Sequence, residues 1–355
     1  MLNDSTLVTI FLRGGADGLA LVPAVGDANY HRLRPRIAIK PGVGEKLDER
    51  FSLAPELSAL ATFWRNGQLA VIQDAASSDG TRSHFYAQPL LERGSAEAAG
   101  GWIARYAQAR GATGMTALAF GDAVPESLRG AAAATAVRSL DDLDPGPRVA
   151  DLGERLSALY ADDTLLGGPA SDTRSAMEKL RDLRHSTYRP EFGARYGDGD
   201  FAVQLAQTAQ LIKAGIGVPA VCLDLGGWDS HVGQDQFLSP LLRPLGDGLA
   251  AFATDLGPAL ERTSIVIYTE FGRRVAENSG LGTDHGHGFA MFVLGGGTLG
   301  GLHVDWAGLD DQDLLGPGDL PGRIDYRAAL VSVVARHEVA PQAVFPDFTG
   351  QALPL

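Results

Sequence analysis

The sequence predicts an α/β protein with a mainly parallel sheet that is covered by helices on both faces. Short apolar runs rich in β-branched residues alternate with segments of helical period, and such runs are typical of strands buried on both faces. The 45 glycines among 355 residues favour many tight turns between strands and helices, and the chain is long enough to bury a large core. The alternation indicates crossover connections between parallel strands.

Six runs have the character of strands. The first, Thr6 to Leu12, is a continuous apolar and β-branched run that ends abruptly at Arg13. Strands are expected at residues 6–12, 68–73, 116–120, 218–223, 264–269 and 289–294.

Helices are expected where apolar residues recur at three- and four-residue spacing. These segments are 102–110, 148–160, 171–183, 201–214, 241–256 and 326–336. Residues 121–168 are rich in Ala, Asp and Pro with weak strand signals, and we expect a peripheral insertion or cap there. Without an internal repeat or a long linker, residues 1–355 are expected to form a single domain.

The composition argues against several classes of function. A formal net charge of -13 would repel nucleic acid and anionic lipid, so neither is expected as a partner. Cys222 is the only cysteine, so an intrachain disulfide and a zinc site of several cysteines are excluded. Any metal must therefore be held by His, Asp, Glu or hydroxyl ligands.

The chain is expected to be soluble, because no apolar run is long enough to span a bilayer. The first residues lead straight into a strand-like run and have no signal peptide. As written, the protein is therefore expected in the cytoplasm, or in the periplasm or exported if a signal has been trimmed.

Ligands gather outside the carboxyl ends of parallel strands, so polar residues directly after the expected strands are the first candidates for a site. After the first strand, Arg13 could bind a charged oxygen and Asp17 could ligate a metal. A tight turn followed by a helix N-cap is the alternative.

Ser83 and His84 follow the second expected strand. Ser83 could be a nucleophile at the positive end of a helix, where charge on a phosphate or sulfate would be stabilised. Thr81 is a weaker candidate, and an ordinary N-cap is the alternative for both hydroxyls.

Two further loops supply possible metal ligands. Asp229 and His231 stand two residues apart in a loop opened by glycines, so both can turn toward one cation. Glu270 follows a buried strand, where a carboxylate must be coordinated or paired, with Arg273 or Arg274 as the ion-pair alternative.

The strongest signal is the glycine-separated group of Asp284, His285 and His287 directly before the last expected strand. It favours a metal site or general acid/base chemistry over packing. The remaining histidines lack convergent polar neighbours in the sequence and are expected in core or surface roles: His31, His185, His303 and His337.

These motifs resemble the bacterial family catalogued as domain of unknown function 1501, a relative of the alkaline phosphatase and sulfatase superfamily. The resemblance runs over nearly the whole chain. It is carried by Phe11-Leu12-Arg13-Gly14-Gly15-Ala16-Asp17-Gly18-Leu19, Arg82-Ser83-His84-Phe85, Gly226-Gly227-Trp228-Asp229-Ser230-His231, Thr269-Glu270-Phe271-Gly272-Arg273 and Gly282-Thr283-Asp284-His285-Gly286-His287-Gly288.

The resemblance implies a three-layer αβα sandwich of the alkaline phosphatase type. Active members of the superfamily place a Ser, Thr or formylglycine nucleophile against one or two metals and hydrolyse phosphate or sulfate esters. By motif, Ser83 or Thr81 matches the nucleophile. The metal ligands implied are Asp17, Asp229, His231, Glu270 and the late histidine, His287 or His285.

One motif departs from the superfamily pattern. Glu270-Phe271 stands where many superfamily enzymes have Asp-His, so one imidazole is missing. A single metal or a metal-free site therefore becomes an alternative to a two-metal site.

The leading hypothesis is a metal-dependent hydrolase of phosphate or sulfate esters that uses zinc, manganese or calcium. Its substrate is expected to be a small-molecule or glycan anionic ester, with Arg13 or Arg273 holding the equatorial oxygens. A metal-free hydrolase or transferase, with His84, His285 or His287 as general base, is the second hypothesis. A non-catalytic binding protein on the same scaffold is the third.

Overall fold

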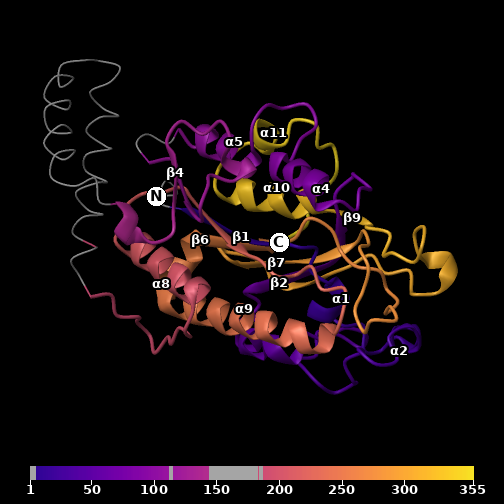
Figure 1. Ribbon diagram of the computed structural model, residues 1–355. Helices are drawn as coiled ribbons and strands as arrows, with labels where there is room; N and C mark the ends of the chain where they lie inside the picture. Colours follow the sequence, from indigo (N-terminus) through magenta and orange to yellow (C-terminus); the bar gives the residue numbers. More distant parts are fainter. Residues whose placement is uncertain (1–4, 112–114, 144–182, 184–186) are drawn as a thin grey trace, which may run out of the picture.

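The computed structural model describes residues 5–111, 115–143, 183 and 187–355. Figure 1 shows three layers, with a twisted sheet between two layers of helices. The sheet has nine strands in the order β4-β3-β5-β1-β6-β7-β2-β8, with β9 also paired to β2. This architecture confirms the predicted α/β sandwich with a mainly parallel sheet.

All strand pairs described are parallel except the two made by β7, which runs antiparallel to both β6 and β2. The central strand β1 pairs in parallel with β5 and β6. The bounds are β1 Thr6–Leu12, β2 Leu69–Ala76, β3 Ala117–Phe120, β4 Ala134–Val137, β5 Ala220–Leu225, β6 Thr263–Tyr268, β7 Phe289–Gly295, β8 Gly301–His303 and β9 Ile324–Asp325.

The six expected strands are all present, and β1 has the predicted bounds. The three additional strands, β4, β8 and β9, span only four, three and two residues. Segments this short show no hydrophobic period in the sequence. Their strand conformation is instead determined by the strands with which they pair. β4 lies within the region expected to be peripheral and joins the edge of the sheet, while residues 144–168 of that region lie outside the described residues.

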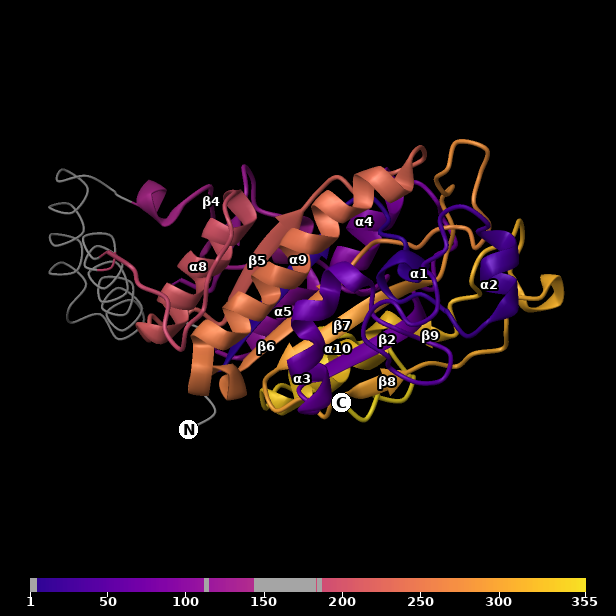
Figure 2. The same cartoon turned by 90° about the horizontal axis from the view of Figure 1, so that it is seen from below.

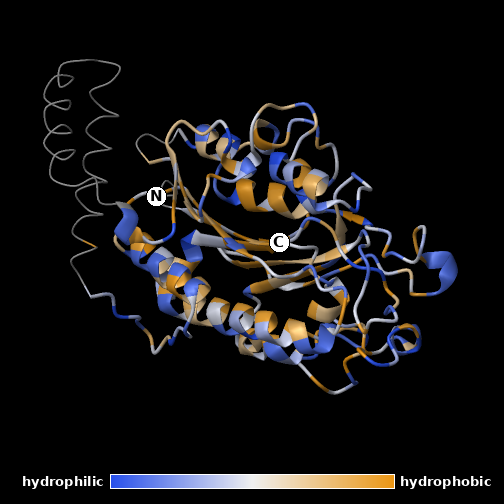
Figure 3. Cartoon of the chain, viewed as in Figure 1, coloured by the Kyte–Doolittle hydropathy of each residue, from blue (hydrophilic) through white to orange (hydrophobic). Residues whose placement is uncertain are grey.

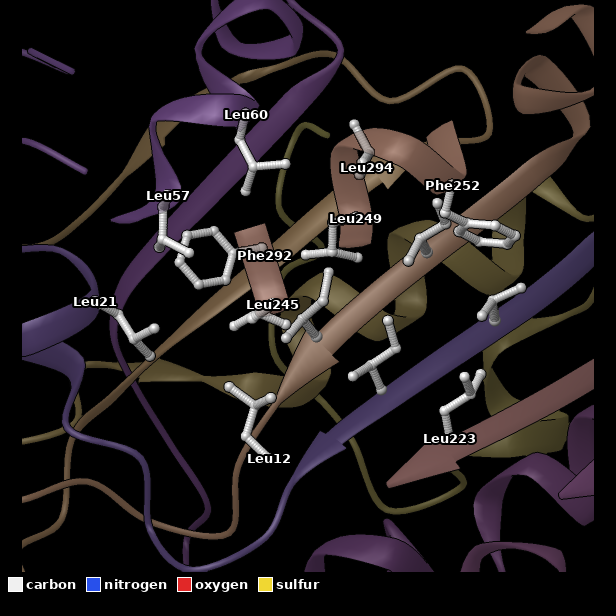
Figure 4. Packing of buried hydrophobic residues seen from close by; sticks show 14 of the residues in the cluster. Leu12, Leu21, Leu57, Leu60, Leu223, Leu245, Leu249, Phe252, Phe292 and Leu294 are labelled. Atoms are coloured by element: carbon white, nitrogen blue, oxygen red, sulfur yellow. The ribbon is translucent and has the colours of Figure 1, made fainter. Parts of the chain in front are cut away.

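One helical layer contains the long helix α9 (Gln234–Leu256) and α8 (Asp200–Lys213). Figure 4 shows Leu245, Leu249 and Phe252 of α9 above Leu12 of β1 and Leu223 of β5. Seen from below, α9 runs across the middle strands (Figure 2). Shorter helices complete this side: α1 Gly18–Leu21, α2 Ala28–Leu33, the 3-10 helix η2 Pro55–Leu60 and α3 Ala61–Arg65.

The second layer covers the opposite face with α4 (His84–Arg93), α5 (Trp102–Ala109), α10 (Tyr326–Arg336) and α11 (Pro341–Val344). Alternation along β1 separates the two cores, because Leu7 and Phe11 face this layer whereas Ile10 faces α9. Figure 3 shows the apolar sides of the helices turned toward the sheet.

The expected helices at 102–110, 201–214 and 326–336 match α5, α8 and α10 closely. α9 begins at Gln234, earlier than predicted, and continues through Pro240 and Pro244 because its apolar stripe packs along the sheet. The segments expected at 148–160 and 171–183 lie outside the described residues, apart from Leu183. In the described part of the chain, no helix is both long and apolar enough to cross a membrane.

Candidate metal centre

The topology brings four loops to one edge of the sheet. β1, β5, β6 and β2 point the same way, so the loops after them meet at their carboxyl ends. β7 runs in the opposite direction, so the loop before it reaches the same edge. This topology brings together four residues that are distant in the sequence: His84, Asp229, Glu270 and His285.

Three imidazole Nε2 atoms converge on the carboxylate of Asp229. The Nε2 atom of His285 lies 3.1 Å from that of His84, 3.0 Å from that of His231 and 2.9 Å from Oδ1 of Asp229. His231 Nε2 is 3.0 Å from the same oxygen, and His84 Nε2 is 3.5 Å from Oδ2. Among the described residues, His84, Asp229 and His285 each offer a ligand atom within 4.8 Å of the other two. The Nε2 atom of His231 lies beside this group, next to His285 and Asp229.

The orientation of His84 is set by Glu270. Nδ1 of His84 lies 2.7 Å from Oε1 of Glu270 and donates its proton to that buried carboxylate. This hydrogen bond raises the pKa of His84 above its usual value, and in the neutral ring it leaves the Nε2 lone pair directed toward Asp229.

His285 is oriented in the same manner by a backbone carbonyl. Its Nδ1 lies 2.8 Å from the carbonyl oxygen of Arg82, which can only accept, so the ring proton is at Nδ1. The bare Nε2 then faces Oδ1 of Asp229, which is another acceptor. A cation between the two atoms, or a second proton on the ring, is needed to make this contact favourable.

His231 is held through its backbone and its second nitrogen. Asn278 donates to its carbonyl oxygen at 3.0 Å and to Asp284 Oδ1 at 3.1 Å. The same Asp284 oxygen lies 3.6 Å from Nδ1 of His231. The imidazole is therefore directed inward by a loop that Asn278 fixes in place.

This donor set fits one divalent cation. Bonds of about 2.0–2.1 Å from nitrogen or oxygen to a tetrahedral zinc ion place ligand atoms about 3.3 Å apart. The separations that involve His285 or Asp229 range from 2.9 to 3.5 Å, and the group whose ligand atoms are all mutually close is His84, Asp229 and His285. The side chains of Asp229 and His231 are 50% and 42% exposed, which leaves one side open to a ligand from solvent. Three nitrogens and one oxygen suit zinc or manganese better than calcium, which prefers all-oxygen ligands.

Arg273 places a buried positive charge behind the cluster. It donates to Asp229 Oδ1 at 2.8 Å and to the carbonyl oxygens of Gly15, Trp228 and Thr283. Burial disfavours ionisation of Asp229, but a hydrogen bond from His285 Nε2, which requires the second proton on that ring, and the hydrogen bond and charge of Arg273 outweigh it and hold the pKa of this carboxyl well below its usual value. Arg273 thus holds together the loops that contain Gly15, Trp228 and Thr283, and it favours the ionised form of Asp229. Because its guanidinium group is used in these bonds, it has little access to a substrate.

Glu270 supports the cluster from behind, although the sequence favoured it as a ligand. Its Oε1 accepts from Gly14 N–H, His84 and Gln88, and its Oε2 accepts from Thr269. Burial opposes its ionisation, but the hydrogen bonds from His84 and Gln88 lower its pKa to about 2. With its oxygens occupied, Glu270 remains ionised and acts by positioning His84.

Phe271 stands where the resemblance drawn from the sequence implies an imidazole. Its ring lies 4.8 Å from that of His84 and 4.9 Å from that of His285. A side chain at Gly15, which has φ +66°, would collide with this ring. The Phe271 ring thus forms an apolar wall beside the imidazoles of His84 and His285.

Asp17, for which the sequence predicts a metal-ligand role, is held in a buried ion pair. It is 2% exposed, and both carboxylate oxygens accept from Arg34, with further bonds from Gln234 and Leu19 N–H. This buried ion pair joins α1, α2 and α9. We no longer include Asp17 among the proposed ligands because its oxygens are already used.

Arg13 and His287 also lie outside the group of converging nitrogens. The Arg13 side chain donates to Asp224, Glu92 and Gln88, and Gln88 in turn donates to Glu270. The His287 ring packs against Gly322, where an added Cβ would lie 2.9 Å from Nε2, and burial lowers the pKa of this histidine.

Ser83 is the N-cap residue of α4, yet its side chain makes no capping hydrogen bond. The hydroxyl is half-buried and directly precedes His84. The Ser83 hydroxyl therefore does not cap the helix, and the hypothesis that Ser83 is the nucleophile stays open. Thr81 remains the second candidate, and its hydroxyl accepts a hydrogen bond from Ser83 N–H at 3.3 Å.

Two supporting residues were not anticipated. Gln88 lies four positions after His84 on α4 and links Glu270 to Arg13; the i, i+4 spacing is the only sequence signal for it. Asn278 joins His231 to Asp284 and has no such signal, because the loop that carries it is irregular.

A family comparison agrees with the resemblance. The model for "Protein of unknown function (DUF1501)" matches residues 169–313, a range that includes Asp229, His231, Glu270 and His285. The similarity to this family is confirmed over that range, while His84 lies before it. None of the curated proteins matches the chain.

Solved structures with similarity to the chain include phosphatases and sulfatases. Alkaline phosphatase from the Antarctic bacterium TAB5 has 10% identity, with 84% of this chain and 94% of that chain covered, at a TM-score of 0.34. The C-terminal periplasmic domain of EptC from Escherichia coli, in complex with zinc, has 9% identity, 82% and 72% coverage and a TM-score of 0.37. A putative sulfatase from Bacteroides thetaiotaomicron has 8% identity, 99% and 76% coverage and a TM-score of 0.40.

Proposed function

We propose that this protein is a metal-dependent hydrolase of phosphate or sulfate esters and that His84, Asp229, His231 and His285 hold its cation. The observation that carries the proposal is the convergence of three Nε2 atoms on one carboxylate, with separations of 2.9 to 3.5 Å. A cation between these atoms, or a second proton on the rings, makes such contacts between acceptor atoms favourable, and the cation is the explanation proposed here.

A divalent cation at this position would polarise the ester oxygen and stabilise the charge that develops on it. The chain supplies the rest of the site. The N-terminal end of α4 points its positive dipole toward the loop that carries Ser83, and this supports binding of an anionic group. The Ser83 hydroxyl, free of a capping bond, is the proposed nucleophile.

The metal and the activity can be tested together. The purified protein is expected to contain about one equivalent of zinc or manganese and to hydrolyse an aryl phosphate or aryl sulfate. The variant His231→Ala should lose both metal and activity, whereas the control His31→Ala, on α2, should keep both because His31 only bonds the carbonyl oxygen of Val25. Absence of bound metal, with no gain of activity on addition of zinc, manganese or calcium, would count against the proposal.

The contact between His84 and Glu270 supports a second candidate, a metal-free hydrolase or transferase that uses His84 as general base. The 2.7 Å hydrogen bond to Glu270 raises the pKa of His84, as a general base requires. Activity that persists in a strong chelator but disappears in His84→Ala would select this alternative over the metal-dependent one.

A further inference from the structure

We propose that the groove beside Asp229 and His231 binds an uncharged aromatic group, so that the preferred substrates are esters of aromatic alcohols. This inference rests on the proposed ester hydrolysis and extends it to the organic part of the substrate. The glycan esters considered from the sequence would then be poor substrates.

The groove opens directly from the candidate metal centre. It has a volume of about 490 Å³, within the range of small-molecule sites. Asp229 and His231 belong both to its wall and to the converging ligand atoms, so a group bound there would place an attached ester beside the cluster. The lining residues are Gly227, Asp229, Ser230, His231, Val232, Phe237, Pro240 and Leu241.

Beyond Asp229 and His231 the wall is mainly apolar. Val232 and Phe237 are 62% and 60% exposed, which leaves large apolar surface in water until a ligand covers it. The Phe237 ring offers a face or edge for an aromatic group. Among the described residues that line the groove there is no lysine or arginine, so a second anionic group on the substrate would have no counter-charge.

The wall is held in place by backbone hydrogen bonds to the neighbouring loop. Gly233 N–H donates to the Gly280 carbonyl oxygen at 2.9 Å, and Gln234 N–H donates to that of Leu281 at 2.8 Å. Asn278 fixes His231 in the same segment. The groove is therefore formed before a ligand arrives, which lowers the entropic cost of binding.

Substitution of Phe237 tests the inference. For 1-naphthyl phosphate or sulfate, whichever ester class is turned over, Phe237→Ala should lower kcat/KM by roughly tenfold or more, within the range for lost apolar contacts. For the matching ester of glucose at its 6-position, the change should stay within about twofold. Phe237→Leu should recover much of the loss because it restores apolar area.

Phe192→Ala is the matched control, since Phe192 is 62% exposed and lies against Gly257, just beyond the other end of α9. Phe237 is in the first turn of α9, and Gly257 directly follows the last residue of that helix. The helix therefore separates the two positions by roughly 30 Å at a rise of about 1.5 Å per residue. This control should leave both rates unchanged. Equal losses for both esters in Phe237→Ala, or a wild-type preference for the sugar ester, would overturn the inference.

Binding of the product alcohol separates this inference from the proposed function. 1-Naphthol should quench or shift its fluorescence on binding to the wild-type protein, and Phe237→Ala should weaken that binding roughly tenfold. If naphthol binds in this way but no ester is hydrolysed, the proposed function fails. If esters are hydrolysed but naphthol binding is absent or unaffected by Phe237→Ala, the groove assignment fails.

Discussion

Nδ1 of His84 lies 2.7 Å from Oε1 of Glu270, on the side of the imidazole opposite Asp229. A buried carboxylate behind a histidine is a common way to fix a ligand's tautomer and to increase its basicity. Glu270 itself makes four hydrogen bonds within the chain and needs no cation. The sequence offered His84 as a general base and Glu270 as a metal ligand. The contact instead favours the proposal that His84 is the ligand and Glu270 its support.

Glu270→Gln is expected to weaken metal binding by about 10- to 100-fold without abolishing it, because the imidazole loses its charged partner. Chelator competition with the purified protein measures this. The control is Glu126→Gln, which removes a carboxylate that pairs with Arg93 and Arg129 and touches none of the proposed ligands. This variant should keep the metal affinity of the wild-type protein. Wild-type affinity in Glu270→Gln would show that the carboxylate does not support a ligand.

Ser83→Ala is expected to lower kcat by roughly three orders of magnitude or more while metal content stays at the wild-type level, as for removal of a nucleophile. Ser78→Ala, an exposed serine in the same loop, is the control. Near-normal kcat in Ser83→Ala would exclude Ser83 as the attacking group. Thr81 or a water molecule would then be the remaining candidates.

Asp17→Asn tests whether this aspartate is structural. The change leaves the Arg34 charge, which is 1% exposed, without its partner, so the free energy of unfolding should fall by about 3–5 kcal/mol. Denaturant titration measures the loss, and metal content should not change. If Asp17→Asn is as stable as the wild-type protein but no longer binds metal, Asp17 is a metal ligand after all.

His337 is expected to make the protein less stable in acid. Burial lowers the pKa of this histidine to about 3. In the buried position, Ser264 and Tyr106 form hydrogen bonds with its neutral ring. In the unfolded chain its pKa returns to about 6.5, so between these values the unfolded state binds more protons than the folded state. The free energy of unfolding should therefore fall as the pH drops through this window, by up to about 1.4 kcal/mol per pH unit.

Denaturant unfolding at several pH values below about 6.5 measures this slope. His337→Gln should be less stable near neutral pH, because it disturbs a buried network, but its stability should depend less steeply on pH. An identical slope in the variant and the wild-type protein would assign the acid sensitivity to other groups.

Local patterns in the sequence were sufficient for six strands of the sheet and for the loops that form the candidate site. The run from Thr6 to Leu12 predicted β1 because a continuous apolar strand must be buried on both faces. Asp229 and His231 were identified because both stand in one loop after a strand. Pairings between distant segments could not be predicted: His84 meets Glu270 across 186 positions and His285 across 201.

The same limit explains the different role of Asp17. Its sequence context, a glycine-rich turn after a strand, is compatible with either a ligand or a cap. Arg34, which occupies it, is 17 residues away and is placed by α2. Only the packing of α1 against α2 distinguishes the two roles, and that contact leaves no local pattern in the sequence.

The most direct test of the central claim is an anomalous-difference map from crystals grown with zinc or manganese. One peak is expected between the Nε2 atoms of His84, His231 and His285 and the Asp229 carboxylate, at about 2.0–2.2 Å from each ligand atom. No peak at this position, or a peak bound by Asp17 or His287 instead, would contradict the proposed metal centre.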